Sequence, residues 1–278
     1  MRFSGGSHQQ QQNLSSSELV IPKFQTAYAD IEDRRTRRIL TFDIEKIDSC
    51  CINLTTEDCV CIVGDERKYT NAILMRLCVR ALMSKRQGGF ESTNVIFIDA
   101  GNNSDAFNQC VNFARQYGLD IKKVLQGIMM TRAFTIYQLA DFIIYQLPRM
   151  IQQFNTKVIV ISDLLNMFTQ EHDPNIDHNE AIFLIKEIMN SIKNTLDKTL
   201  VVVSFQQQHN NKSYAYDKIL LPRFDKHIEI TNRNNNSKIN LLLDVKIYDY
   251  NYSKKNYKNY NRSLLLEERD LQIVYAST

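Results

Sequence analysis

The sequence predicts an α/β protein, with a mostly parallel central sheet covered by helices on both faces and an antiparallel hairpin toward its C-terminus. Short apolar runs alternate along the chain with longer segments of helical periodicity. The runs are apolar at nearly every position, which is typical of parallel strands whose two faces are both covered. With 278 residues, 44% of them hydrophobic, the chain can bury the core that this architecture needs.

The predicted elements follow one another in a regular order. Residues 71–85 place Ile73 and Leu77 at helical spacing after an apolar run at 59–63. Toward the C-terminus, two apolar stretches flank a polar turn at 232–238, which predicts an edge hairpin. The predicted strands are 59–63, 95–98, 127–130, 158–161, 200–203, 227–231, 239–245, 264–266 and 271–274, and the predicted helices are 71–85, 104–117, 136–154 and 178–195.

We expect three parts along the chain. Residues 1–20 are polar, with a glutamine run and a serine run, and are expected to form a disordered tail. Residues 21–45 are expected to be a linker with a charged surface helix, and residues 46–278 the core domain with its C-terminal hairpins. No apolar run is long enough to span a membrane and no secretion signal is evident, so we expect a cytoplasmic protein without membrane contacts.

Bulk charge and cysteine content point to no particular chemistry. The net charge of +3 is too small to indicate a nucleic-acid partner by itself. None of the six cysteines forms a C-x-x-C pair, so buried thiols are favoured over a zinc site. Cys59 and Cys61 lie in a predicted strand, two residues apart, and should share one face of it.

The turn after the first predicted strand stands where a nucleotide-binding protein carries its phosphate loop. The strand leads into Gly64, and a helix is expected to start near Asn71, which is the context that such a loop needs. Tyr69, Thr70 and Asn71 occupy the places of the glycine, the lysine and the Ser/Thr of the motif. Without that glycine and lysine, Gly64, Lys68, Thr70 and Asn71 are expected to form a vestigial phosphate loop.

Ligands of parallel sheets bind at the carboxyl ends of the strands, so the residues that follow each strand are candidates. Asp163 follows the strand at 158–161 and could hold Mg²⁺, although a carboxylate that caps a turn is the alternative. Gln206 stands at the end of the next strand and could sense a terminal phosphate. Asp99 also ends a strand, but no glutamate that could polarise an attacking water follows it.

These segments resemble the RecA-type recombinases, in particular the archaeal RadA branch. The resemblance covers about residues 24–250 and implies a RecA-like core of the P-loop ATPase type. It rests on the order and spacing of several pieces, each of which is weak alone. The pieces are Phe24-Gln25-Thr26-Ala27, similar to the F-x-x-A polymerisation motif, the strand ending at Asp99, the segment ending at Ala133-Phe134, the strands ending at Asp163 and Gln206, and the edge hairpin.

At several positions where the resemblance implies functional residues, this chain carries different ones. The family's water-activating glutamate falls at Gly101, and its first DNA loop falls at 169–180, where acidic residues would repel a phosphate backbone. The second DNA loop falls at 206–223, which could equally be an ordinary solvated loop. Its candidate DNA contacts are Lys212, Tyr214, Lys218 and Arg223, with Tyr216 as a further aromatic residue for base stacking.

Three hypotheses follow for the function. In the favoured one, the protein is a catalytically impaired accessory or mediator of recombination and DNA repair. It would dock on an active RadA-like recombinase or paralog through Phe24 and Ala27 and could contact single-stranded DNA. In the second, it is a divergent DNA-dependent ATPase that uses ATP and Mg²⁺, with Lys68 or Arg67 in place of the missing lysine. In the third, it binds DNA without ATP.

Overall fold

The computed structural model describes residues 26, 39–49, 54–168, 177–206, 216, 219–232, 242–249 and 261–267. The chain divides into two compact units, Met1–Arg37 and Arg38–Thr278, and every described residue except Thr26 belongs to the second. Phe24 and Ala27, the expected docking residues, therefore lie outside the described residues, as do Lys212, Tyr214 and Lys218.

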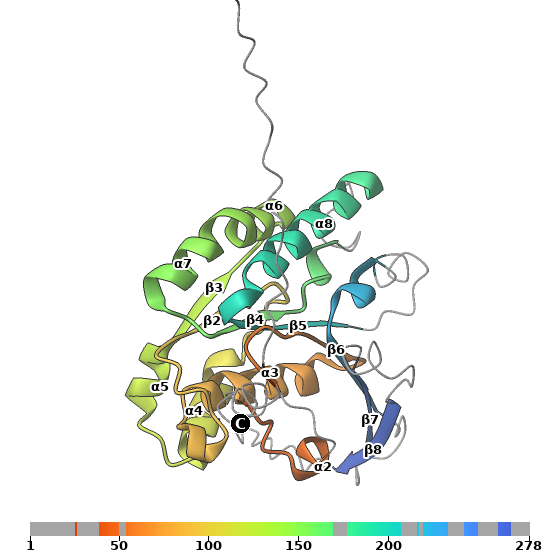
Figure 1. Ribbon diagram of the computed structural model, residues 1–278. Coiled ribbons are helices and arrows are strands. Elements are labelled where there is room, and N and C mark those ends of the chain that lie inside the picture. The colour runs from red at the N-terminus through yellow and green to blue at the C-terminus, as the bar shows by residue number, and fades with distance from the viewer. Residues whose placement is uncertain are drawn as a thin grey trace, which may run out of the picture. The chain divides into compact units, whose positions relative to one another are not determined.

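The second unit is built on one eight-stranded sheet in the order β3-β2-β4-β5-β1-β6-β7-β8 (Figure 1). The first six strands of this order pair in parallel, and β7 and β8 extend the sheet antiparallel. This arrangement confirms the predicted fold class. The strands are β1 Cys59–Gly64, β2 Val95–Asp99, β3 Ile128–Arg132, β4 Val158–Ser162, β5 Leu200–Gln206, β6 Lys226–Asn232, β7 Leu242–Asp249 and β8 Asn261–Glu267.

The predicted strand at 264–266 is present within β8, which pairs antiparallel with β7. Its expected pairing with 271–274 stays a prediction. The edge hairpin predicted from 227–231 and 239–245 is present as β6 and β7. Residues 271–274 lie outside the described part of the chain.

Helices cover both faces of the sheet (Figure 1). One face carries α3 Arg67–Ala81, α4 Ala106–Gln116 and α5 Ile121–Gly127, and the other carries α6 Ile136–Asp141, α7 Leu147–Phe154 and α8 His178–Asn194. The sequence did not predict α5. The short elements are α2 Glu45–Asp48 and the 3-10 turns η1 Lys85–Gln87, η3 Asn166–Phe168, η4 Leu196–Lys198 and η5 Leu221–Arg223.

Alternate side chains of each central strand enter two separate cores, because successive residues of a strand point to opposite faces. In β1, Val60 and Ile62 pack with α3, α4 and α5, whereas Cys59, Cys61 and Val63 pack with α6, α7 and α8. Cys59 and Cys61 thus share one face, as predicted, and both are buried thiols. A strand that is apolar on both faces is therefore buried on both.

The segment predicted as a single helix at 136–154 contains a π-helical turn, η2 Phe142–Gln146, between α6 and α7. Pro148 stands in the first turn of α7, where its ring would crowd the carbonyl four residues earlier in an unbroken α-helix. The wider π turn relieves that crowding. The hydroxyl of Ser191 on α8 donates to the carbonyl of Ile143 at 2.9 Å, so α8 satisfies an acceptor within the turn.

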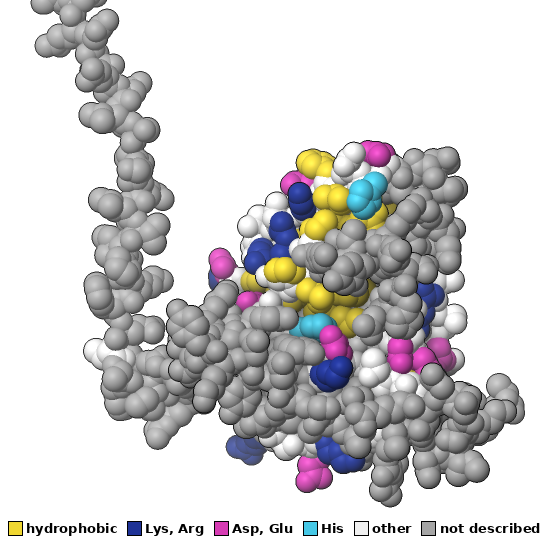
Figure 2. Space-filling model, turned by 90° about the vertical axis from the view of Figure 1, so that its right-hand side faces the viewer, with side chains coloured by type: hydrophobic (Ala, Val, Ile, Leu, Met, Phe, Trp, Pro, Cys, Tyr) yellow, Lys and Arg dark blue, Asp and Glu magenta, His cyan; other side chains and the backbone are white. Residues whose placement is uncertain are grey.

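Hydrophobic side chains also reach the surface. Figure 2 shows them as a band on the side of the molecule that lies at the right of Figure 1. Apart from this view, the large exposed hydrophobic side chains among the described residues are Phe107, Met130, Phe134, Tyr137, Tyr145 and Phe183, which belong to several different elements. None of the described helices combines the length and the apolar character that crossing a membrane requires.

The buried His227 on β6 makes the stability of the fold depend on pH. Burial lowers the pKa of this imidazole from 6.5 to about 4. The folded protein therefore binds fewer protons than the unfolded chain between these two pH values, so the stabilisation is complete above pH 6.5 and is lost as the pH falls toward 4. We expect the free energy of unfolding to drop by roughly 3 kcal/mol between pH 7 and pH 4 from this residue alone.

Urea unfolding of the wild type and of His227→Gln across this pH range checks the expectation. The difference between the two proteins should be nearly flat above pH 6.5 and should change steeply below it. A difference that does not vary with pH would contradict the assignment to His227.

Candidate functional site

The candidate site lies where the middle strands of the sheet end. Gly64, the last residue of β1, is paired in register with Gln206, the last residue of β5. Asp163 directly follows β4. Strand β5 lies between β4 and β1 and pairs with both. The parallel topology thus brings three of the predicted site residues to the same edge of the sheet, in the place that such sheets use for ligands.

The turn between β1 and α3 is too short to enclose a phosphate. Helix α3 begins at Arg67, so only Asp65 and Glu66 separate it from β1. The prediction that the helix starts near Asn71 was wrong, because residues 67–71 already form its first turns. A phosphate loop needs several non-helical residues whose N–H groups converge on the ligand, and the turn does not supply them.

The residues expected to contact phosphate and Mg²⁺ have other contacts. Thr70 is buried, and its hydroxyl donates to the carbonyl of Arg67 at 3.0 Å. Its methyl group lies so close to Gly64 that a Cβ added there would be 2.4 Å from it. Lys68 places its ammonium 5.4 Å from the centre of the Tyr69 ring, and Asn71 is half-buried one turn into the helix.

Two carboxylates occupy the start of α3. The Asp65 carboxylate accepts from the main-chain N–H of Asn232 at 2.7 Å, and the Glu66 carboxylate accepts from the Asn232 side-chain amide at 2.7 Å. Negative groups are stabilised at a helix N-terminus, which is also the place where a phosphate would bind. The turn is therefore bound to the end of β6, and its charge opposes the approach of a nucleotide.

Asp163, the expected Mg²⁺ ligand, instead forms an ion pair with Arg67. The Nε atom of Arg67 lies 2.7 Å from Oδ2 of Asp163, and the guanidinium also donates through Nη2 to the side-chain oxygen of Asn166. The carboxylate side chain is 7% exposed and the guanidinium 43% exposed. Within the described residues, no three His, Cys, Asp or Glu side chains lie close enough together to hold a metal ion.

Asp163 has a strained backbone and a perturbed carboxyl group. Its φ angle is +52°, in the left-handed region that is uncommon for residues other than glycine. Its main-chain N–H donates to the Ser204 hydroxyl at 3.0 Å. Burial raises the pKa of the Asp163 carboxyl, while the charge of Arg67 and a hydrogen bond from the backbone of Gln206 act in the opposite direction. Strain of this kind persists only where surrounding contacts hold the residue in place.

Gly101 leaves the space that Asp163 fills. A Cβ added to Gly101 would lie 2.5 Å from the Cβ of Asp163 and 3.0 Å from its Oδ2. Gly101 is the position where the resemblance implies a water-activating glutamate. A glutamate there would collide with Asp163. The present position of the Asp163 side chain therefore requires that residue 101 has no side chain.

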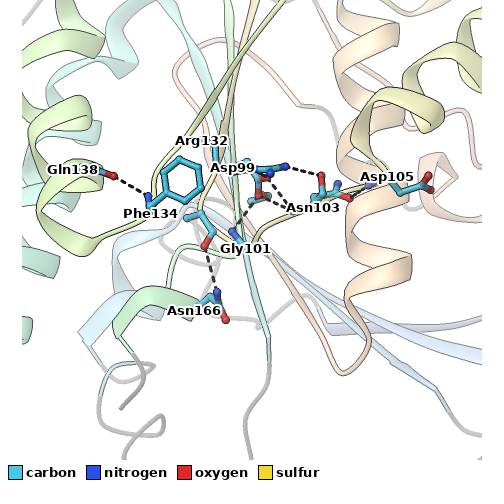
Figure 3. A network of polar contacts seen from close by, with 10 residues as sticks. Asp99, Gly101, Asn103, Asp105, Arg132, Phe134, Gln138 and Asn166 are labelled. Carbon is cyan, nitrogen blue, oxygen red and sulfur yellow. Dashed lines mark hydrogen bonds and ion pairs between the residues drawn. The ribbon is translucent and has the colours of Figure 1, made fainter. Parts of the chain in front are cut away.

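Asp99 is the centre of a second polar network beside this site (Figure 3). Its carboxylate accepts from the main-chain N–H groups of Gly101 and Asn103 at 2.9–3.1 Å and from the Ser162 hydroxyl at 3.1 Å. The Nε atom of Arg132 donates to it at 2.9 Å. Because every strong acceptor direction is taken by the protein, Asp99 holds the ends of β2, β3 and β4 together.

The Arg132 side of this network borders a hollow at the edge of the sheet. The hollow has a volume of about 330 Å³ and is lined by Ile98, Ala133, Phe134, Phe142, Arg132 and Asp141, among others. Phe134 is 75% exposed, and its main-chain N–H donates to the Gln138 side chain at 2.9 Å (Figure 3). Among the described residues, β3 pairs with β2 and with no strand on its other side.

The remaining candidates lie elsewhere. Arg223, an expected DNA contact, donates from Nη1 to the side-chain oxygen of Asn190 on α8 at 2.9 Å. Tyr216, considered for base stacking, is buried with its hydroxyl 3.3 Å from the His178 ring, so its ring is not free to stack on a base. Gln206 is the register partner of Gly64, and its expected role as a phosphate sensor stays a prediction.

Sequence reasoning missed the pairing of Arg67 with Asp163 and the roles of Asn166 and Asn232. Arg67 was considered only as a substitute for the phosphate-loop lysine. The available signal was the presence of two consecutive basic residues, Arg67 and Lys68, after the first strand together with a carboxylate at the end of another strand, which favours an internal ion pair. Asn232 gave no signal, because its partners lie more than 160 positions away in the chain.

Comparison with known proteins gives one finding. A family model described as Rad51 matches residues 40–231, which is more than half of the chain and includes all the site residues discussed above from Gly64 to Arg223. No curated protein matches the chain.

The contact between Gly101 and Asp163 gives a prediction for stability. Gly101→Ala should lower the free energy of unfolding by roughly 1–3 kcal/mol, because the added methyl group displaces a buried side chain that the surrounding contacts hold. The same change made in an Asp163→Gly background should cost clearly less, because that substitution removes the Cβ that stands 2.5 Å from the added methyl group. Urea unfolding of the four proteins measures both, and equal costs in the two backgrounds would contradict this account.

Proposed function

The chain belongs to the Rad51 family, and we propose that it is an accessory member that acts in recombination and DNA repair without using a nucleotide. The single observation that carries this proposal is the occupation of the expected nucleotide site by the protein's own charges. Arg67 pairs with Asp163, and Asp65 and Glu66 stand at the start of α3. A nucleoside triphosphate with Mg²⁺ would have to displace an ion pair and approach two carboxylates.

The alternative of a divergent ATPase has less support. It requires Arg67 or Lys68 to neutralise phosphates, but the Arg67 guanidinium is engaged with Asp163 and Asn166. The Lys68 ammonium lies over the Tyr69 ring. It also requires a water-activating carboxylate, for which Gly101 offers no side chain and no space. A binding mode based on DNA alone draws no support from Arg223, which contacts α8.

In the proposed role, the protein docks on a recombinase of its own family. Phe24 and Ala27 match the polymerisation motif that the resemblance implies, and a phenylalanine and an alanine three residues apart suit strand addition to a neighbouring subunit. The chain also offers a matching surface, because β3 is an edge strand among the described residues and the 330 Å³ hollow lies beside it. Docking in both directions would place this chain within or at the end of a recombinase assembly.

The first test is nucleotide binding. Isothermal titration of the purified protein with ATP and Mg²⁺ should show no binding tighter than about 1 mM, because the described residues of the site form no phosphate cradle and Arg67 is paired with Asp163. An active recombinase of the family, titrated in parallel, is the positive control. Tighter binding that disappears in Asp163→Ala would overturn the proposal in favour of the ATPase alternative.

The second test concerns docking. Phe24→Ala should weaken binding to a Rad51-family recombinase by roughly thirtyfold, since a buried aromatic anchor is typically worth about 2 kcal/mol at an interface. Phe3→Ala removes another phenylalanine of the same N-terminal unit and serves as the matched control. Equal affinities of the wild type and Phe24→Ala would remove Phe24 from the interface.

A further inference from the structure

Arg67 joins three parts of the chain that are distant in sequence. Its guanidinium extends from the first residue of α3 to Asp163, at the end of β4, and to the side-chain oxygen of Asn166 in η3. The side-chain amide of Asn166 in turn donates to the carbonyl of Ala100, just after β2, at 3.3 Å (Figure 3). Arg67 and Asn166 together therefore connect the ends of β1, β2 and β4.

We propose that Arg67 is a built-in latch: it fixes the segment 162–168 by an internal ion pair, where other proteins of this fold class rely on ligands bound at the strand ends. This deepens the proposed function, because it assigns a role to the site that excludes nucleotide. The segment 162–168 contains the end of β4 and all of η3, so the latch acts on the part of the chain that directly follows a central strand.

The chemistry of the two partners, Asp163 and Asn166, supports a specific role for arginine. A guanidinium presents donors in a planar fork, so it can serve the carboxylate of Asp163 and the amide oxygen of Asn166 at the same time. A lysine ammonium is a point charge on a flexible stem and lacks that planar geometry. Without Arg67, the Asp163 carboxylate would be buried at a strained backbone position with its main charge partner removed.

The hydrogen bonds inside the segment provide the readout. Three main-chain N–H groups of the segment donate to main-chain carbonyls: Leu164 to Ser204, Asn166 to Asp163, and Phe168 to Leu165. Local opening of the segment exposes these amides to solvent, so hydrogen exchange measures how firmly the latch holds. The amides of β2 serve as the internal reference, because main-chain hydrogen bonds to β3 and β4 hold this strand.

The experiment compares amide exchange in the wild type, Arg67→Gln, Arg67→Lys and Arg115→Gln. Arg115 is an exposed arginine on α4 and gives the matched control for the loss of one guanidinium. Exchange at Leu164, Asn166 and Phe168 should accelerate by roughly tenfold or more in Arg67→Gln, and by less in Arg67→Lys, with β2 unchanged. Unchanged exchange at these three amides in both Arg67 variants, or equal effects of Arg67→Gln and Arg115→Gln, would overturn the latch.

Two further measurements keep the result separate from the nucleotide question. Asp163→Asn should accelerate the same amides, and adding Arg67→Gln to it should accelerate them little further, because the two residues act as one pair. Fully additive effects would count against the pair. Exchange in the presence of ATP and Mg²⁺ should match exchange without them. Protection by ATP would contradict the proposed function while leaving the effect of Arg67 on the segment intact.

Discussion

The rest of the site depends on the burial of one carboxylate. Asp163 is almost shielded from solvent at the end of a central strand, and a charge in such a place is costly unless an opposite charge and hydrogen bonds compensate it. Arg67 provides the opposite charge, which requires α3 to begin directly after a two-residue turn. Gly101 provides the space. The short turn, the early helix start and the missing side chain thus all contribute to the surroundings of this one carboxylate.

The acidic turn before α3 also places negative charge at the N-terminal end of this helix. The N–H groups at the start of α3 form a positive end that commonly attracts anions. Here Asp65 and Glu66 supply the negative charge, and both are held by Asn232 at the end of β6. The same contacts therefore neutralise the helix and connect the antiparallel part of the sheet to its parallel centre. The carboxylates of Asp65 and Glu66 thus stabilise the folded protein at a place where a bound anionic ligand would otherwise do so.

Much of the fold could be predicted from the sequence, because a strand buried on both faces leaves a local signal. The run at 59–63 became β1, and the strand ends placed Asp163 and Gln206 at one edge. The start of α3 could not be predicted in the same way. Residues 65–68 are all charged, which locally indicates a loop, and the partners of the Arg67 side chain lie nearly one hundred positions away. Contacts of that range carry no periodicity, so topology was predictable and the pairing within the site was not.

The contact between Gly101 and Asp163 also bears on how such a sequence can change over generations. A larger residue at 101 is blocked while Asp163 stands against it, and loss of Arg67 alone leaves a buried carboxylate without its counter-charge. Each of these two single changes is therefore costly, although a combined change need not be. Substitutions at positions 67, 101 and 163 should accordingly be tolerated in combinations that none of them tolerates alone.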